Sequence, residues 1–326
     1  MTATTTATAI TPRGPFSLAA SVRFLAGFTP AGYRGAPDGT DGTVLRLAFP
    51  ADDGHSTVGA EVRQPQGPGA VVEADVTGDP GAARAQLARV LSLDVDGSGF
   101  PGLAEGDPVV AGLMAAYPGL RPVCFHSPYE AAAWSVIGHR IRMVQAAAIK
   151  ARIAEHLGRH VAVGGQSLYA FPTPLVLRGI GRVPGLPDVK AERLRVLADA
   201  ALAGDLDAAR LRAMPVDDAL AHLRTLPGIG PFSAELVLIR GAGHPDVFPH
   251  HEPRLHAAMA EAYGRPGTGT DAQARVGISD RWAPYRSWVA LLLRTRAAAT
   301  TWQRPVSWEH RQAPRAVQEG RLPSRP

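Results

Sequence analysis

The chain has one cysteine, two lysines and no long apolar run. Its single cysteine, Cys124, excludes an intrachain disulfide and an iron–sulfur cluster held by four cysteines. A membrane-spanning helix needs about 18 or more consecutive apolar residues, and no such run occurs. Residues 1–7 contain neither the basic nor the apolar segment of a secretion signal. We therefore expect a cytoplasmic protein that makes no membrane contact.

Acidic residues are outnumbered only in the second part of the chain. Residues 1–120 hold 7 arginines and 12 acidic residues, whereas residues 121–326 hold 27 basic and 17 acidic residues. The formal net charge of +5 therefore divides into −5 and +10. A basic segment attracts polyanions such as DNA. With 326 residues, of which 45% are apolar, the chain is long enough for two domains with cores of their own.

The first domain is predicted over residues 13–122 and is rich in strand patterns. Alternating apolar residues predict three strands, separated by Asp, Gly and Pro turns, at 44–49, 56–62 and 70–76. Helices are predicted at 18–25 and 80–91. This pattern indicates an antiparallel sheet with helices on one side, and no candidate site lies in it. We expect residues 1–12 and the Arg/Pro-rich tail at 305–326 to be disordered.

The second domain is predicted to be all-α and to span residues 123–304, which makes the whole chain an α+β protein. Ser127 is a helix cap, with Pro128 and Glu130 in the first turn. A core stripe at helical spacing follows: Trp134, Ile137, Ile141, Val144 and Ala148. Further helices are predicted at 188–202, 216–223 and 285–298.

Residues 226–238, with the sequence LPGIGPFSAELVL, predict a tight glycine turn between two helices. Gly228 and Gly230 permit positive φ, and Pro231 suits a first helical position. The backbone N–H groups of such a turn bind an anion without reading sequence, and a DNA phosphate fits a turn this shallow. A glycine-terminated helix pair without a ligand is the alternative interpretation.

A loop with two carboxylates, Asp246 and Glu252, follows this hairpin. The hairpin and the loop together resemble the helix-hairpin-helix DNA glycosylase superfamily, and within it most closely the bacterial 3-methyladenine DNA glycosylase II group. The resemblance covers roughly residues 15–303 and includes three further motifs: 127–138, 171–174 and 281–287.

The resemblance implies a monofunctional DNA glycosylase of base excision repair. Such an enzyme flips an alkylated purine, for example 3-methyladenine, out of duplex DNA and hydrolyses its N-glycosidic bond. The catalytic aspartate of the family falls on Glu252, and Asp246 matches an acidic residue without a catalytic role. Glutamate is one methylene longer than aspartate, so its contact with the water or the sugar must differ. This departure from the family pattern puts the rate of the reaction, and the activity itself, in question. The alternative interpretation is that Glu252 only favours the start of a helix beside Pro253.

The resemblance also assigns roles to other residues. Gly228, Ile229 and Gly230 form the phosphate-binding hairpin, and Arg140 matches the side chain that fills the gap left by the flipped nucleotide. Phe232 stands where bifunctional relatives carry a Schiff-base lysine, so no lyase activity is expected. The expected base pocket comprises Phe232, Leu236, Trp282 and Arg294. Arg140 as a plain surface residue and Phe232 as a core residue are the alternatives.

No cofactor is expected, apart from a possible structural monovalent cation on the carbonyls of the hairpin, as in the family. The sequence His250-His251-Glu252 is not expected to bind a metal, because adjacent residues of an extended loop point to opposite sides. The expected partner is double-stranded DNA with damaged bases, bound by a nucleoid-associated monomer. Two alternatives stay open: a glycosylase for another base lesion, and a non-catalytic lesion-binding protein.

Overall fold

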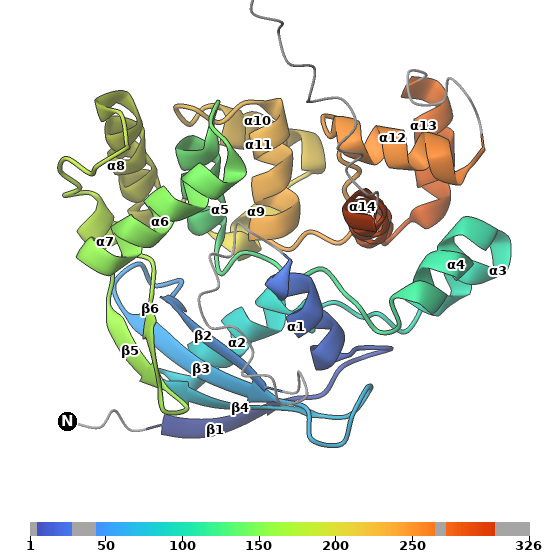
Figure 1. The fold of residues 1–326 in the computed structure, drawn as a ribbon, viewed down its shortest axis with the longest axis horizontal. Helices are drawn as coiled ribbons and strands as arrows, with labels where there is room; N and C mark the ends of the chain where they lie inside the picture. Colours follow the sequence, from blue (N-terminus) through green and yellow to red (C-terminus); the bar gives the residue numbers. More distant parts are fainter. Residues whose placement is uncertain (1–4, 28–43, 265–271, 304–326) are drawn as a thin grey trace, which may run out of the picture.

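The computed structural model describes residues 5–27, 44–264 and 272–303. A sheet lies at the lower left of Figure 1, and helices form a layer above it and to its right. Buried apolar side chains gather in three clusters: one between the sheet and its helices, one among the central helices, and one among the helices at the right. The fold is of the predicted α+β class. In the described ranges no helix is long and apolar enough to cross a membrane.

The N-terminal sheet has four antiparallel strands in the order β1-β4-β3-β2. Its strands are β1 (Thr5–Ile10), β2 (Val44–Pro50), β3 (Thr57–Arg63) and β4 (Val72–Thr77). Successive side chains of a strand point to opposite faces, which explains why β2 buries Leu45, Leu47 and Phe49. Two helices complete this cluster: α1 (Leu18–Ala26) and α2 (Pro80–Val90). The three strands and two helices predicted here all lie within two residues of their expected bounds.

Strand β1 corrects the expectation that residues 1–12 are disordered. Thr5 lies opposite Thr77 and Ile10 opposite Val72, so the whole of β1 pairs with β4. Of its six residues only Ile10 is buried, and the sequence therefore carries almost no strand periodicity. Backbone pairing with β4, which a local pattern cannot reveal, creates this strand. Residues 1–4 and the tail at 305–326 lie outside the described residues.

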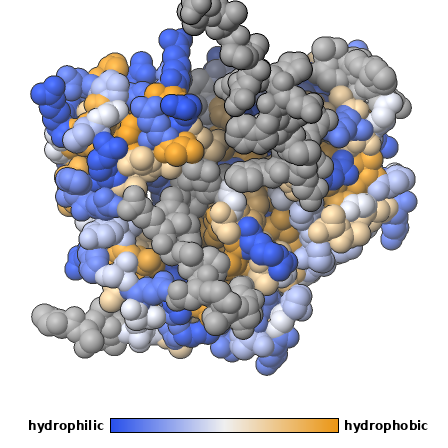
Figure 2. Space-filling view, viewed as in Figure 1, coloured by the Kyte–Doolittle hydropathy of each residue, from blue (hydrophilic) through white to orange (hydrophobic). Residues whose placement is uncertain are grey.

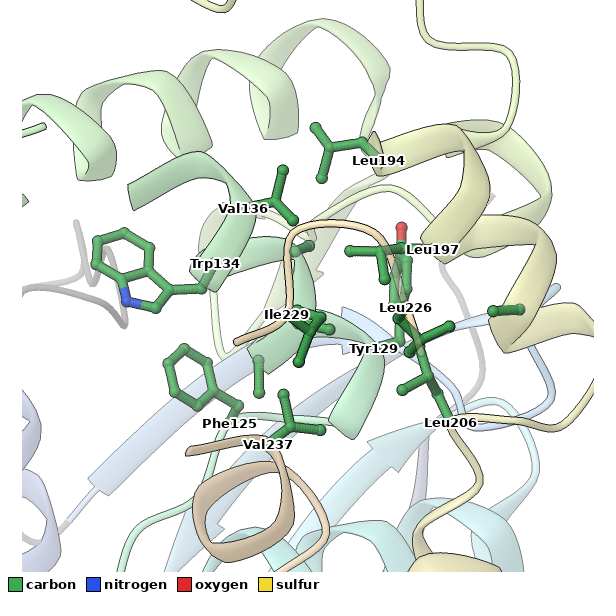
Figure 3. Close-up of a cluster of buried hydrophobic side chains, with 14 of the residues drawn as sticks. Phe125, Tyr129, Trp134, Val136, Leu194, Leu197, Leu206, Leu226, Ile229 and Val237 are labelled. Atoms are coloured by element: carbon green, nitrogen blue, oxygen red, sulfur yellow. The ribbon is translucent and has the colours of Figure 1, made fainter. Parts of the chain in front are cut away.

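The central helices surround the cluster drawn in Figure 3. They are α5 (Pro128–Gly138), α6 (Met143–Leu157), α7 (Pro174–Leu177), α8 (Asp188–Leu202), α9 (Ala208–Ala213), α10 (Val216–Arg224) and α11 (Pro231–Leu236), which continues as a π-helical turn, η3 (Val237–Gly241). The Ser127 hydroxyl accepts a hydrogen bond from the Glu130 N–H at 3.2 Å, which confirms the predicted cap of α5. Ile229 points from the hairpin into the cluster, near Val136 and Val237 (Figure 3).

The predicted core stripe of this region is only half correct. Trp134 and Ile137 are buried, whereas Val144 is 76% exposed and Ala148 is also exposed. Because α5 ends at Gly138 and α6 begins five residues later, the intervening turn resets the helical phase. Helix α6 therefore buries a different set of residues: Ala146, Ile149 and Ile153.

A second correction is a β-hairpin within the part predicted to be all-α. Strands β5 (His160–Val163) and β6 (Gln166–Tyr169) pair with each other and lie beside β2 and β3 of the N-terminal sheet (Figure 1). The approach is close, because a Cβ atom at Gly59 would lie 2.6 Å from Val161 Cγ1. Each strand has four residues, too few for a clear alternating pattern in the sequence.

The third cluster takes residues from both sides of the domain boundary predicted at residue 122. Leu113 comes from the N-terminal part and Leu293 from the last helix, and both are fully buried in this cluster. The helices concerned are α3 (Leu103–Gly106), α4 (Pro108–Ala116), α12 (Pro253–Ala262), α13 (Ala272–Ser279) and α14 (Arg286–Gln303). The predicted boundary therefore separates the sheet from the central helices but does not separate α4 from α14.

A buried arginine, Arg121, connects these parts. Its guanidinium donates to carbonyl oxygens of two segments and lies 5.0 Å from the ring centre of Trp288 in α14. Burial lowers the pKa of Arg121 to about 10, and its acceptors compensate for the lost hydration. These acceptors are the carbonyl oxygens of Arg13, Pro15, Ser92 and Val95.

Helix α5 is anchored by a buried ion pair. The Glu130 carboxylate accepts from Lys150 Nζ at 2.5 Å and lies 2.7 Å from His126 Nδ1. Burial by itself would raise the pKa of Glu130, but the charges of His126 and Lys150 outweigh burial and hold the pKa well below its usual range. Folding therefore favours the ionised carboxylate.

Glu130→Gln tests this anchor. We expect it to lower the free energy of unfolding by about 3 kcal/mol at pH 7, because it leaves the buried Lys150 ammonium without its counter-charge. A depressed folded-state pKa stabilises the protein above the unfolded pKa of about 4.3, and that stabilisation is lost as the pH falls below it. The difference between parent and variant in urea unfolding should therefore shrink from pH 7 to pH 3.5. A difference that does not depend on pH would contradict the assignment, and the exposed Glu192→Gln is the control expected to change little.

Candidate active site

The glycine hairpin joins α10 to α11 and has the predicted turn. Gly228 has φ +89°, and a Cβ atom there would lie 3.0 Å from Arg193 Cδ. Gly230 does not adopt the positive φ that the sequence suggests, since its φ is −91° and it caps the N-terminus of α11. A Cβ atom at Gly230 would meet no atom within 4 Å. The turn is therefore held by Gly228 and Ile229, while Gly230 leaves open space in front of the first N–H groups of α11.

Basic side chains lie next to this turn. Lys190 Nζ of α8 donates to the carbonyl oxygens of Ile137 and His139, both at 2.8 Å, and so caps the C-terminal end of α5. Burial lowers the pKa of His139, and the charges of Arg140, Lys190 and Arg193 lower it further. In Figure 2 hydrophilic side chains gather at the upper left, where α8 lies in Figure 1. The charges of Arg140, Arg193 and the buried Lys190 all act on His139, and we name these three residues the hairpin basic patch.

Arg140 lies in the turn between α5 and α6, where the sequence places the wedge residue. It is exposed and has φ +57°, a left-handed conformation that is uncommon for a residue with a side chain. Because the helix ends two residues earlier, the Arg140 side chain is carried on a projecting turn and not on a helix face. This position is compatible with a side chain that inserts into bound DNA, and it is equally compatible with a plain surface arginine.

Glu252 directly precedes α12, whose first residue is Pro253. Its Oε1 accepts a hydrogen bond from the Arg254 N–H at 3.3 Å and lies 3.7 Å from Arg294 Nε. The Glu252 side chain is 21% exposed, so solvent reaches it. Both interpretations drawn from the sequence are compatible with this geometry, because the carboxylate caps a helix and is also accessible.

Arg294 of α14 lies beside Glu252, as a shared pocket requires. Burial lowers the pKa of Arg294, the Glu252 carboxylate partly restores it, and the nearby Arg254 lowers it again. Arg294 keeps its positive charge throughout the physiological range, since the pKa of a free guanidinium is above about 12. The surroundings of Glu252 therefore include a fixed cation.

Asp246, the other carboxylate of the loop, is engaged in an ion pair. Its Oδ2 accepts from Arg286 Nη1 at 2.7 Å, and its Oδ1 accepts from the Arg286 N–H at 3.2 Å. These bonds attach the start of the loop to the N-terminus of α14. The geometry agrees with a supporting role for Asp246 outside the reaction.

One residue of this region, Glu235, has no role in the sequence interpretation. It lies on α11 and is 3% exposed, and its carboxylate contacts the loop just before Glu252 through the N–H groups of His250 and His251. The only signal in the sequence is a carboxylate within an otherwise apolar run, residues 234–239. A buried carboxylate needs hydrogen-bond donors, but a sequence does not say from where they come.

The residues of the predicted base pocket differ in their exposure. Phe232 of α11 is 46% exposed, so its ring is available to a ligand and is not a core residue. Leu236, one turn further along the same helix, is partly buried against the central cluster. Phe232, Leu236 and the Arg294 side chain can therefore contribute to a pocket wall.

Trp282 is wrong as a pocket residue. Its side chain is fully buried in the third cluster, near the rings of Phe248 and Tyr263. Tyr285 and Trp288, two further aromatic residues close to it in the sequence, are buried in the same cluster. Local composition cannot distinguish an aromatic core from an aromatic pocket, because both need the same residue types.

Within the described residues, no group of three or more His, Cys, Asp or Glu side chains is arranged to hold a metal ion. His251 turns its Nδ1 toward Glu235 at 2.7 Å. The His250 ring packs edge-on against Phe248, with the ring centres 5.0 Å apart. The two neighbouring histidines therefore have separate contacts.

No family model matches the sequence. Among proteins with curated names, the chain is similar to the DNA-3-methyladenine glycosylase 2 of Escherichia coli, with 31% identity over 214 residues. That alignment covers 64% of this chain and 69% of the relative. The DNA-3-methyladenine glycosylase of Bacillus subtilis is 29% identical over 165 residues, which cover 48% of this chain and 53% of the relative. The chain thus spans about half the length of the second relative.

A solved structure shares the fold along almost its whole length. The 3-methyladenine DNA glycosylase of Archaeoglobus fulgidus superposes with a TM-score of 0.72 and 22% identity, over 90% of this chain and 98% of that protein. At this level of identity the likeness establishes the architecture alone. The 31% identity across more than two thirds of the Escherichia coli enzyme shows that the chain belongs to the DNA-3-methyladenine glycosylase family.

Proposed function

We propose that the protein is a monofunctional DNA glycosylase of base excision repair that releases alkylated purines such as 3-methyladenine from duplex DNA. The observation that carries the proposal is the accessible Glu252 carboxylate, located on the loop that follows a glycine hairpin with open backbone N–H groups. The hairpin can hold the DNA backbone while the carboxylate faces the sugar. Family membership supports the same activity.

The reaction needs little more than one anion. A purine alkylated on a ring nitrogen is already cationic, so it leaves readily without a strong general acid. As its bond to the sugar breaks, positive charge develops on the sugar, and a nearby carboxylate stabilises that charge. The same carboxylate can orient or deprotonate the attacking water. In this proposal Glu252 has both tasks.

The other residues bind and expose the substrate. Gly228, Ile229 and Gly230 present backbone N–H groups to a phosphate, and the hairpin basic patch attracts the DNA backbone around them. Arg140 enters the gap left by the flipped nucleotide, and the exposed ring of Phe232 stacks on the extruded base. These contacts do not depend on the base sequence of the DNA, which suits an enzyme that must recognise a lesion in any sequence context.

The ion pair of Glu252 with Arg294 favours a second candidate, a non-catalytic lesion-binding protein. A carboxylate that caps a helix and pairs with an arginine already has a structural role. The fixed cation also repels a positively charged base, which shifts preference toward neutral lesions. Release of free base from alkylated duplexes separates an enzyme from a binding protein, and a panel of defined lesions separates one glycosylase from another.

Neither of the two lysines in the sequence is placed for lyase chemistry. Lys150 is buried in its ion pair with Glu130, and Lys190 is buried and donates to two carbonyl oxygens. Neither amine is presented to a sugar, and Phe232 stands at the position of the family's Schiff-base lysine. The proposal further includes a nucleoid-associated monomer that needs no cofactor, with at most a structural monovalent cation at the hairpin.

Glu252→Gln should abolish most base release, because it keeps the size of the side chain and removes the charge. We expect single-turnover release from an alkylated duplex to fall by about 10² to 10⁴, with DNA binding unchanged. Glu252→Asp restores the family residue, and retained activity would show that the site accepts either length. Glu261→Gln, on the exposed side of the same helix, is the matched control. Turnover at the parental rate by Glu252→Gln would overturn the proposed role.

Gly230→Asp and Gly230→Asn test the hairpin as a phosphate site. Both side chains have open space and cap a helix N-terminus well, so both variants should fold like the parent. Only the aspartate repels a phosphate, and we expect it to bind any duplex at least about tenfold more weakly than the asparagine variant at low salt. The difference should decrease as salt increases. Equal affinities of the two variants would show that no phosphate binds there.

Borohydride trapping tests the monofunctional assignment. A Schiff base between a lysine and the sugar would be reduced to a stable protein–DNA adduct. We expect no adduct, and the abasic product should stay intact until it is treated with base. An adduct in the parent that is lost in Lys190→Arg would contradict the assignment.

A further inference from the structure

Glu235 is a buried carboxylate whose charge is balanced by one short segment of chain. It lies on α11, five residues after Gly230, and is 3% exposed. Removing a carboxylate from water is costly unless hydrogen-bond donors replace the water. The position of those donors therefore shows what the side chain holds in place.

Every side-chain hydrogen bond recorded for Glu235 within the described residues reaches the two residues that precede Glu252. The His250 N–H donates to Oε1 at 3.0 Å, and the His251 N–H donates to Oε2 at 2.9 Å. His251 Nδ1 lies 2.7 Å from Oε1. The two backbone donors use both carboxylate oxygens, so the carboxylate clamps the loop from one side.

These hydrogen bonds fix the backbone position from which the Glu252 side chain extends. Residues 243–252 belong to no helix or strand, so side-chain contacts must fix this loop. Asp246 attaches its first part to α14, and α12 fixes the chain after Pro253. Between these anchors, Val247 bonds to the Ser287 hydroxyl and Phe248 is buried in the third cluster. Glu235 holds the last two residues before Glu252. Helix α11 therefore carries the hairpin at its start and the anchor of the Glu252 loop about one turn later.

We infer that Glu235 is a positioning residue, which sets the place of the Glu252 carboxylate relative to DNA bound at the hairpin. The inference rests on the proposed role of Glu252. Electrostatic stabilisation depends strongly on placement, and an error of about 1 Å at a reacting group can reduce a rate by 10²-fold. Glu235 itself touches neither DNA nor sugar.

Glu235→Gln is the test, because the amide has the same shape but turns an NH₂ donor toward one of the two backbone N–H groups. Two abasic-site analogues in duplex DNA serve as probes: a cationic pyrrolidine, which imitates the charged sugar, and a neutral tetrahydrofuran. The parent should bind the cationic analogue more tightly. We expect Glu235→Gln to reduce this preference and the single-turnover release rate by about tenfold or more, while affinity for the neutral analogue stays within about threefold.

Two further variants make the result decisive. His251→Ala removes the ring but keeps both backbone donors, so its release rate should stay within about threefold of the parent. Glu252→Gln should abolish the preference for the cationic analogue. If Glu252→Gln loses the preference and Glu235→Gln keeps it, the positioning role is wrong and the proposed function stands. If Glu252→Gln keeps the preference, the role of Glu252 is wrong and the inference about Glu235 falls with it. If Glu235→Gln lowered the affinity for both analogues equally, the result would show general structural damage and would also overturn the inference.

Discussion

The burial of the Arg121 guanidinium constrains how the main parts of this molecule are arranged. A buried cation is tolerated when hydrogen-bond acceptors such as carbonyl oxygens converge on it. Here those oxygens come from the segment before α1 and from the segment after α2, and Trp288 of α14 lies against the same group. The sheet and the last helix are therefore fixed to one point. This explains how the N-terminal domain can define the position of α14, which carries Arg294.

The candidate site lies between two hydrophobic clusters. The hairpin is anchored in the central cluster by Ile229, whereas α12 and α14 belong to the third cluster. Glu252 and Arg294 therefore belong to a part of the molecule that packs separately from the hairpin. Glu235 is a direct polar link between the two parts. A carboxylate that must stabilise charge on a bound sugar needs such a link, because packing of apolar surfaces is less directional than hydrogen bonding.

Local signals predicted several helices well, since caps and turns depend on neighbours in the sequence, but they gave no prediction for α4, α9 or α13. Ser127 caps α5, and Gly204, with φ +83°, follows the end of α8. Elements that form only by pairing with a distant segment were not predicted. Strand β1 exists because β4 pairs with it, and the hairpin of β5 and β6 lies against β2 and β3. The exposure of Val144 likewise follows from the turn around Arg140, where the helical phase restarts.

For the site, the sequence by itself determined the chemistry that is available: a glycine turn with Gly228, a following carboxylate at Glu252, and a phenylalanine at 232 where a covalent mechanism would need a lysine. The glycine turn and the carboxylate follow from residue types and their spacing along one chain, whereas the meaning of Phe232 comes from the resemblance to the family. Only the tertiary structure decided that Trp282 is a core residue, that Arg294 pairs with Glu252, and that Glu235 holds the loop. The physical reason is that burial and hydrogen-bond partners depend on contacts between segments far apart in the sequence. These contacts form only when the hydrophobic clusters pack.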